Sequence, residues 1–138
     1  GIKTLSLRME KHEENESFIA DKLKNHNNVE VVYWPGLKSH HGHMIHKSQS
    51  SGYGGMVSFK ASKNIHFDNL VSKRKYWTLA ESLGGVESLL CVPSKMTHAS
   101  IDEKTRQKKG ITDNLVRLSC GVEDCEDLWN DLAKGLDS

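Results

Sequence analysis

The sequence has 138 residues, which is enough for one domain with a single core. Hydrophobic residues make up 36% of it and charged residues 27%, a composition typical of globular proteins and not of disordered ones. Because 19 Lys and Arg stand against 18 Asp and Glu, the formal net charge is only +1, and nucleic acid is not expected as a partner. No apolar run approaches the roughly 20 residues of a membrane span, so a membrane is not expected either.

The cysteines and the first residues bear on where the protein works and how complete it is. Cys91, Cys120 and Cys125 are odd in number and form no C-x-x-C pair, which argues against a disulfide framework and a zinc site. Scattered thiols are typical of a reducing compartment, so we expect a cytoplasmic protein. The sequence starts at Gly1 without an initiator methionine and enters a helical pattern at once. We therefore expect it to be a piece of a longer protein.

Residues 1–24 predict one long helix. A stripe with alternating spacings of three and four residues runs along them. Its members are Ile2, Leu5, Met9, His12, Glu16, Ile19 and Leu23. Because the middle of the stripe is polar, at His12 and Glu16, we expect a partly exposed helix that crosses from its own core to a neighbouring part. The alternative is a helix whose apolar ends dock on parts of the protein outside this sequence.

Short strands and short helices alternate along the rest of the chain. Apolar runs bounded by glycine, proline or asparagine predict strands at 29–34, 56–60, 77–80, 86–92 and 115–120. Short helical segments are expected at about 44–48, 66–73 and 101–110.

The last two helices carry signals at their ends. Ser100-Ile101-Asp102-Glu103 has the pattern of a capping box, and Gly110 suits the left-handed residue that closes such a helix. An apolar stripe from Val122 to Leu136 predicts a final amphipathic helix, which begins near acidic residues that suit its positive N-terminus. We expect Trp129 of this helix to pack on the sheet.

Four or five short strands with helices at both ends of the chain predict an α+β fold. The expected architecture is a small, mainly antiparallel sheet with helices packed on one face. The sequence holds no internal repeat and no low-complexity linker, so we expect residues 1–138 to form a single domain.

Motifs for several common chemistries are absent. The glycine clusters at 52–55 and 84–85 precede strands, whereas a phosphate-binding loop follows a strand and opens a helix, so no nucleotide site is predicted. No G-x-S-x-G motif marks a nucleophilic serine. The four histidines between His40 and His46 resemble a metal-binding tract, but they fall in a predicted irregular loop. We therefore expect no physiological metal site, and only adventitious metal binding there.

A few polar residues stand in apolar or glycine-bounded surroundings. They are Glu81 and Ser82 before Leu83-Gly84-Gly85, Thr97 shortly after Pro93, and Arg117 between Val116 and Leu118. An arginine in the middle of a strand is commonly an outward-facing surface residue. The alternative is a buried guanidinium that binds a carboxylate through two parallel, charge-assisted hydrogen bonds. Spacing alone leaves both alternatives open.

Several longer segments resemble one enzyme family. In chain order they are Arg8-Met9-Glu10-Lys11-His12, Tyr33-Trp34-Pro35-Gly36-Leu37, Gly52-Tyr53-Gly54-Gly55-Met56, the run from Tyr76 to Leu89, Met96-Thr97-His98-Ala99-Ser100, Gly110-Ile111-Thr112-Asp113 and the run from Leu115 to Asp124. Over essentially the whole chain, these segments resemble the C-terminal region of the Cys/Met-metabolism enzymes that use pyridoxal 5'-phosphate (PLP). This trans-sulfuration family includes cystathionine γ-synthases, γ-lyases and β-lyases. The resemblance implies the C-terminal, substrate-side domain of a fold-type I PLP enzyme.

The resemblance also implies roles for individual residues. Arg117 would bind the α-carboxylate of an amino-acid substrate, and Ser82 would act catalytically beside the lysine that carries PLP. Thr97 would support the same pocket. Glu81 would occupy a substrate-binding position whose character separates γ-type members of the family from β-lyases. The implied reaction is elimination or replacement on a sulfur-containing or O-acylated amino acid.

The family's PLP-bearing lysine and phosphate-binding residues belong to a preceding large domain, which this sequence lacks. The resemblance therefore implies PLP in the full-length enzyme and no cofactor-binding residue in this chain. We expect this chain alone to be inactive, and the full-length enzyme to be a homo-oligomer, specifically a tetramer.

The sequence also departs from the family pattern. Cys120 stands where valine is commoner, and Cys91 and Cys125 are atypical as well; we interpret all three as small buried hydrophobic residues. Two other functions stay open as alternatives. One is a catalytically inactive stand-alone binding or assembly module of the same fold, and the other is a small metal-binding protein centred on residues 40–46.

Overall fold

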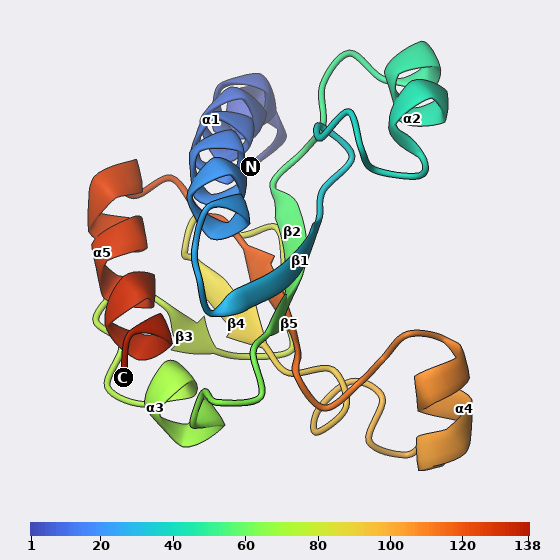
Figure 1. The fold of residues 1–138 in the computed structure, drawn as a ribbon. Helices are drawn as coiled ribbons and strands as arrows, with labels where there is room; N and C mark the ends of the chain where they lie inside the picture. Colours follow the sequence, from blue (N-terminus) through green and yellow to red (C-terminus); the bar gives the residue numbers. More distant parts are fainter.

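The computed structural model describes all of residues 1–138 (Figure 1). Its strands are β1 (Val29–Tyr33), β2 (Met56–Ala61), β3 (Thr78–Leu79), β4 (Leu89–Cys91) and β5 (Leu115–Ser119). A short 3-10 turn (Ile2–Thr4) leads into α1 (Leu5–Lys24), and the other helices are α2 (His43–Gln49), α3 (Phe67–Val71), α4 (Glu103–Lys108) and α5 (Cys125–Leu136).

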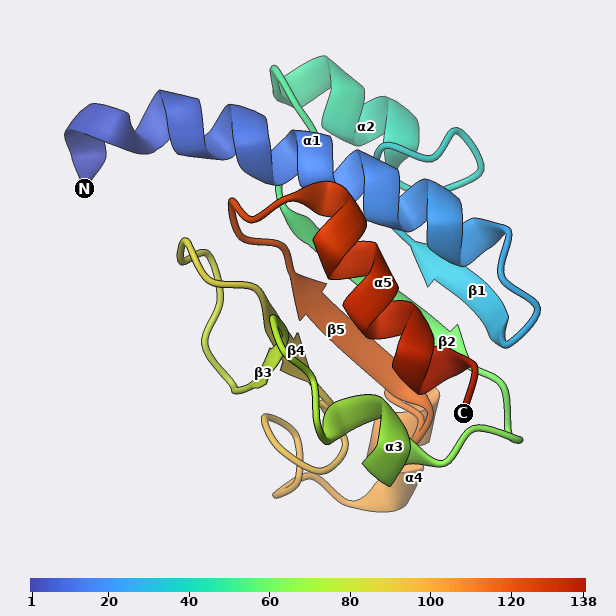
Figure 2. The same cartoon turned by 90° about the vertical axis from the view of Figure 1, so that its left-hand side faces the viewer.

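The strands form one five-stranded sheet in the order β1-β2-β5-β4-β3. Three of its four pairings are antiparallel, and only the short β3 runs parallel to β4. Helices α1 and α5 lie across one face of the sheet, with α3 beside α5, while α4 lies apart from this layer (Figures 1 and 2). The prediction of a small, mainly antiparallel sheet with helices on one face is therefore confirmed.

The core lies between the sheet and the helical layer. Alternation along the strands places Val57 and Phe59 of β2 and Val116 and Leu118 of β5 in this core, where each is at most 1% exposed. They are joined by apolar side chains from the helices, namely Ile19, Ala20, Leu23, Leu70, Leu128, Leu132 and Leu136. Burying each large aliphatic side chain contributes about 1.5–3 kcal/mol, so this layer fixes the orientation of β5.

Helix α1 is exposed over its N-terminal part and buried over its polar middle. His12 is 3% exposed and Glu16 is fully buried, whereas Ile2 is 83% exposed and Leu5 and Met9 are each 42% exposed. Figure 2 shows the reason, because the first half of α1 projects beyond the sheet. The rest of the helix packs against α5, β1 and β2. The prediction of a partly exposed helix is therefore confirmed, and the exposed part is the apolar N-terminal end while the polar middle is buried.

The predicted capping box before α4 does not form. The carboxylate of Asp102 accepts the Thr105 N–H at 3.0 Å and the Thr105 hydroxyl at 2.7 Å, so Asp102 and not Ser100 is the N-cap. These two hydrogen bonds hold the pKa of Asp102 below its ordinary value. Gly110 has a φ of +77°, as expected for the left-handed residue that follows such a helix.

The tryptophan buried beneath α5 is Trp77 and not Trp129. Trp77 is 2% exposed, and its indole Nε1–H donates to the carbonyl oxygen of Leu128 at 2.9 Å. Trp129 is half-buried and packs edge-on against His26, with ring centroids 5.9 Å apart. The last helix does pack on the sheet, through the fully buried side chains of Leu128, Leu132 and Leu136, and the half-buried Trp129 packs against this core from outside it.

Candidate functional site

Arg117 lies near the centre of the sheet, on the face away from the helical layer. Strand β5 runs between β2 and β4, and Arg117 stands directly opposite Ser58 and Cys91. Directly opposed residues of antiparallel strands share a face of the sheet. Because Val116 and Leu118 are buried in the core, Arg117 extends from the other face, where its side chain is half-buried.

The guanidinium of Arg117 is held by backbone oxygens of the segment that follows β3. Its Nη2 donates to the carbonyl oxygen of Glu81 at 2.7 Å and approaches that of Ser82 at 3.4 Å. Its Nε is buried without a hydrogen-bond partner, and no carboxylate pairs with the charge. A fixed guanidinium with unused donors suits a planar carboxylate ligand.

The structure thus brings three of the four predicted site residues together. The backbones of Glu81 and Ser82 contact Arg117, and their side chains are exposed. Thr97 is not joined to this group by any hydrogen bond. It is exposed in the turn region after β4, where its Oγ1 pairs with Nδ1 of the adjacent His98 at 2.8 Å.

Sequence reasoning missed a buried polar cluster beneath α1. His12, Asn15 and Glu16 follow one another at helical spacing and are all at most 3% exposed. The Asn15 side-chain amide donates to the carbonyl oxygens of Gly121 at 3.0 Å and Glu123 at 2.7 Å. Both ring nitrogens of His12 and both carboxyl oxygens of Glu16 are buried without partners. The polar middle of the predicted stripe was the available signal, and it marks internal contacts.

Burial strongly perturbs the pKa values of Glu16 in this cluster and of the neighbouring Cys120. Burial raises the pKa of Glu16 from its ordinary 4.5 to about 8, and the neighbouring Cys120 thiol opposes this rise by a smaller amount. Burial also raises the pKa of Cys120 well above its ordinary 9.0, and the negative charge of Glu16 adds to that effect. Both groups are therefore expected to be protonated at pH 7, which keeps a net charge out of the interior.

Two of the four clustered histidines make tertiary contacts. His43 Nδ1 pairs with the carbonyl oxygen of Pro35 at 2.6 Å, and His46 Nε2 pairs with that of Gly52 at 2.9 Å. Both rings stack on Tyr53, each with centroids 5.6 Å from it. No group of three or more His, Cys, Asp or Glu side chains is arranged to hold a metal ion.

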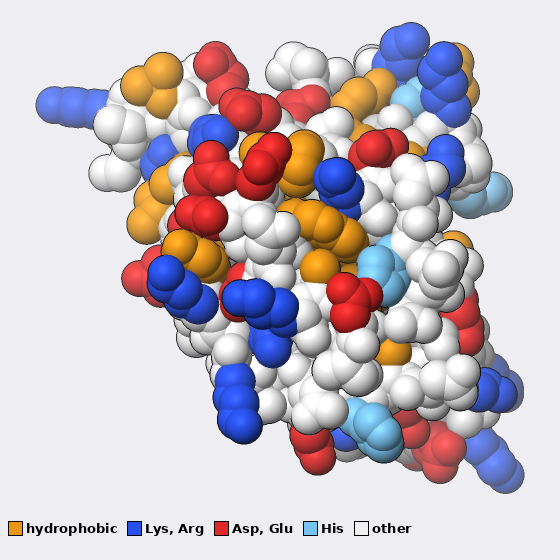
Figure 3. All heavy atoms as spheres, turned by 60° about the vertical axis from the view of Figure 1, so that its left-hand side comes forward, with side chains coloured by type: hydrophobic (Ala, Val, Ile, Leu, Met, Phe, Trp, Pro, Cys, Tyr) orange, Lys and Arg blue, Asp and Glu red, His pale blue; other side chains and the backbone are white.

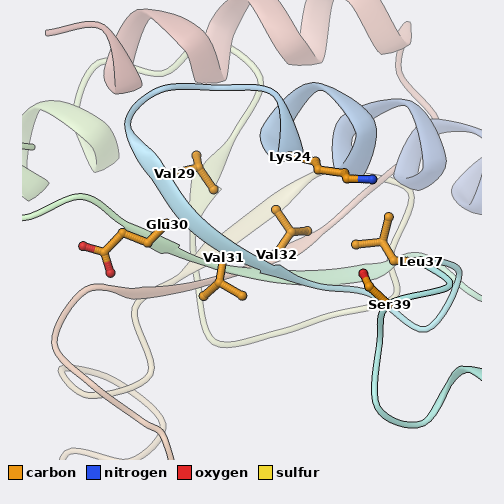
Figure 4. A pocket seen from close by; sticks show the side chains of 7 residues that line it. All are labelled: Lys24, Val29, Glu30, Val31, Val32, Leu37 and Ser39. Atoms are coloured by element: carbon orange, nitrogen blue, oxygen red, sulfur yellow. The ribbon is translucent and has the colours of Figure 1, made fainter.

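A small cavity at the edge of the sheet does not by itself mark a site. One cavity of about 150 Å³ lies beside the edge strand β1, where Val29, Val32 and Leu37 line it with Lys24 (Figure 4). Strand β2 lies between this edge strand and β5, which carries Arg117, and no convergent set of polar side chains lines the cavity. On the face drawn in Figure 3, acidic and basic side chains are interspersed, so no single-sign patch marks that face. No helix has both the length and the apolar character needed to cross a membrane.

Comparison with known proteins gives these features a family context. The sequence profile of the family described as "Cys/Met metabolism PLP-dependent enzyme" matches residues 1–137. The chain is 52% identical over 137 residues to the cystathionine beta-lyase of Lactococcus lactis subsp. cremoris (strain MG1363), which spans 99% of this chain and 36% of that protein.

Solved structures agree with this match. The cystathionine gamma-lyase of Lactobacillus plantarum complexed with L-serine superposes with a TM-score of 0.95 and 42% identity, over 100% of this chain and 36% of that one. The cystathionine gamma synthase of Xanthomonas oryzae pv. oryzae in complex with cystathionine superposes with a TM-score of 0.94 and 45% identity. The match covers 99% of this chain and 36% of that one.

The fold is thus that of a domain found in fold-type I PLP enzymes. The chain belongs to the Cys/Met-metabolism family of PLP-dependent enzymes, and it spans about 36% of the length of the relatives described above. The family resemblance predicted from the sequence is therefore confirmed. The relatives carry beta-lyase, gamma-lyase and gamma synthase names at similar identity, so the family match does not choose among these reactions.

Proposed function

We propose that this chain is the C-terminal, substrate-side domain of a PLP-dependent enzyme acting on cystathionine or on related O-acylated amino acids. The names of the relatives and the fraction of their length that the chain spans support this proposal. The family resemblance implies that the lysine carrying PLP lies in the remainder of the enzyme. When bound, PLP supplies the electron sink for elimination or replacement. We propose that the complete enzyme is a homo-oligomer.

In this proposal Arg117 binds the α-carboxylate of the substrate. The observation that carries this proposal is the fixed guanidinium at the centre of β5. Its Nη2 is held by two backbone carbonyl oxygens, and no carboxylate of the protein pairs with its charge. Its unused N–H groups can donate to both oxygens of a carboxylate, with about 1.5–3 kcal/mol for each charged hydrogen bond. Such a grip orients the substrate's Cα relative to the cofactor.

The other proposed site residues follow from their position beside Arg117. The hydroxyl of Ser82 is exposed on the segment that Arg117 holds, so it is available to position the amine of the cofactor's lysine. Glu81 is equally exposed, and its carboxylate can act on the distal part of the substrate. Thr97 supports the pocket only if the remainder of the enzyme covers its exposed turn, because its hydroxyl now pairs with His98.

The function can be tested by product analysis with the complete, PLP-loaded enzyme. L-cystathionine and an O-acylhomoserine with cysteine are supplied in separate reactions. Cleavage of cystathionine at Cγ releases 2-oxobutanoate and cleavage at Cβ releases pyruvate, while replacement on the O-acylhomoserine forms cystathionine. We expect at least one of these products. Absence of all three from PLP-loaded enzyme would contradict the proposed function.

A further inference from the structure

Residues 80–88 connect β3 to β4 without regular structure, and they carry the candidate site. The end of β5 and the turn that follows it hold this segment by hydrogen bonds to the segment's backbone. The Gly84 N–H donates to Oγ of Ser119 at 2.8 Å, and the Val122 N–H donates to the carbonyl oxygen of Val86 at 3.0 Å. The conformation of the segment therefore depends on the end of β5 and on the turn that follows it, at 119–123.

The C-terminal end of the segment is held by the carboxylate of Glu123. One carboxyl oxygen accepts the Ser88 N–H at 2.8 Å, and the other accepts the Ser88 hydroxyl at 2.7 Å. The Ser88 oxygen in turn accepts the Gly121 N–H at 2.8 Å, and Ser88 is fully buried. Hydrogen bonds to an ionised acceptor are about twice as strong as neutral ones. Glu123 pairs with no cation, so its carboxylate is committed to this segment.

The contact between the turn and the segment leaves no free space. A Cβ atom at Gly121 would overlap the carbonyl oxygen of Val86 and the carboxylate of Glu123. The turn is also fixed from the helical layer, because the buried side chain of Asn15 on α1 donates to two of its carbonyl oxygens. The rigid part of the domain thus reaches the candidate site through Glu123 and Ser88.

We propose that Glu123 is a positioning residue of the candidate site. With Ser88 it fixes residues 80–88, so that the carbonyl oxygens of Glu81 and Ser82 hold the Arg117 guanidinium in the orientation that binds substrate. Glu123 does not touch the substrate in this account. The catalytic consequence rests on the proposed function, whereas the restraint of the segment does not.

The experiment compares Glu123→Ala, Glu123→Gln and Ser88→Ala with the control Glu87→Ala in the complete, PLP-loaded enzyme. Glu87 is exposed in the same segment, and its side chain makes no hydrogen bond. We expect Glu123→Ala and Ser88→Ala to raise KM and to lower kcat/KM per bound PLP by about tenfold, because Arg117 loses its fixed orientation. The double variant Glu123→Ala/Ser88→Ala should lose little more kcat/KM than either single variant, because the two residues share one interaction. Glu123→Gln keeps hydrogen-bonding groups at both positions and should restore most of the kcat/KM.

Hydrogen exchange of the peptide spanning 80–88 is measured on the same proteins. Glu123→Ala should speed exchange there and leave the core strand β5 protected, whereas a general loss of stability would speed both. The proposal is overturned if Glu123→Ala keeps the parental KM and exchange, or if Glu87→Ala changes them equally. If the parent enzyme has no activity, the proposed function fails, and the exchange data alone then decide whether Glu123 restrains the segment.

Discussion

Glu16 should make the stability of this protein fall as the pH rises from about 5 to 8. Its carboxyl group is fully buried, and burial raises its pKa from 4.5 to about 8. Between these values the folded protein keeps a proton that the unfolded chain has lost, so the free energy of unfolding decreases with pH. The slope is about 1.4 kcal/mol per pH unit, which accumulates to about 5 kcal/mol by pH 8 and then levels off.

Urea unfolding followed by circular dichroism at pH 5, 6, 7 and 8 measures this effect against Glu16→Gln, which cannot ionise. We expect the free-energy difference between variant and parent to shift in favour of the variant by several kcal/mol across this range. Glu14→Gln is the matched control, because Glu14 is exposed on the same helix in an ion pair with Lys11 at 3.0 Å, and such pairs contribute roughly 0–1 kcal/mol. Parallel stability curves for the parent and Glu16→Gln would show that Glu16 is ionised in the fold, and would refute this reasoning.

Three further outcomes are expected from the structure. Trp77→Ala should lower the free energy of unfolding by about 3–5 kcal/mol, and Trp129→Ala clearly less, because only Trp77 is fully enclosed; equal losses in urea unfolding would contradict this. A thiol reagent should modify the half-buried Cys125 of the folded protein before Cys91 and Cys120, and mass spectrometry showing early modification of Cys120 would contradict its burial. The 138-residue chain incubated with PLP should yield no borohydride-trapped adduct at a single defined lysine, and a stoichiometric adduct would overturn the assignment of that lysine to the rest of the enzyme.

The sheet could be predicted from the sequence because its central strands alternate clearly. In β2 and β5 the buried residues Val57, Phe59, Val116 and Leu118 stand at every second position, and the predicted and observed bounds differ by one residue at most. Helix α1 shows where such reasoning fails. The spacing places Glu16 in the stripe, but it cannot tell that the fold buries this side chain as a group whose pKa favours the neutral acid.

The candidate site could be predicted only in part. Arg117 stood out as a polar residue inside an apolar strand, but spacing alone could not tell that its guanidinium meets the carbonyl oxygen of Glu81. That contact joins residues 36 positions apart in the chain. The hydrogen bonds of Ser88 with Glu123 span 35 positions and leave no local signal at all. Thr97 stays a prediction, because no hydrogen bond joins it to the other site residues.

The most direct test of the central claim asks whether Arg117 recognises the substrate's carboxylate. In the complete enzyme, kcat/KM is measured for an O-acylhomoserine and for its α-carboxamide, with parental protein, Arg117→Lys and Arg106→Ala. Arg106 is the matched control, because its Nε is also buried without a partner but it lies on α4. We expect the parent and Arg106→Ala to prefer the carboxylate substrate by roughly 2–4 kcal/mol, and Arg117→Lys to lose most of this preference, because an ammonium cannot reproduce the planar, two-pronged geometry. If Arg117→Lys keeps the parental kcat/KM and the parental preference, Arg117 does not bind the α-carboxylate.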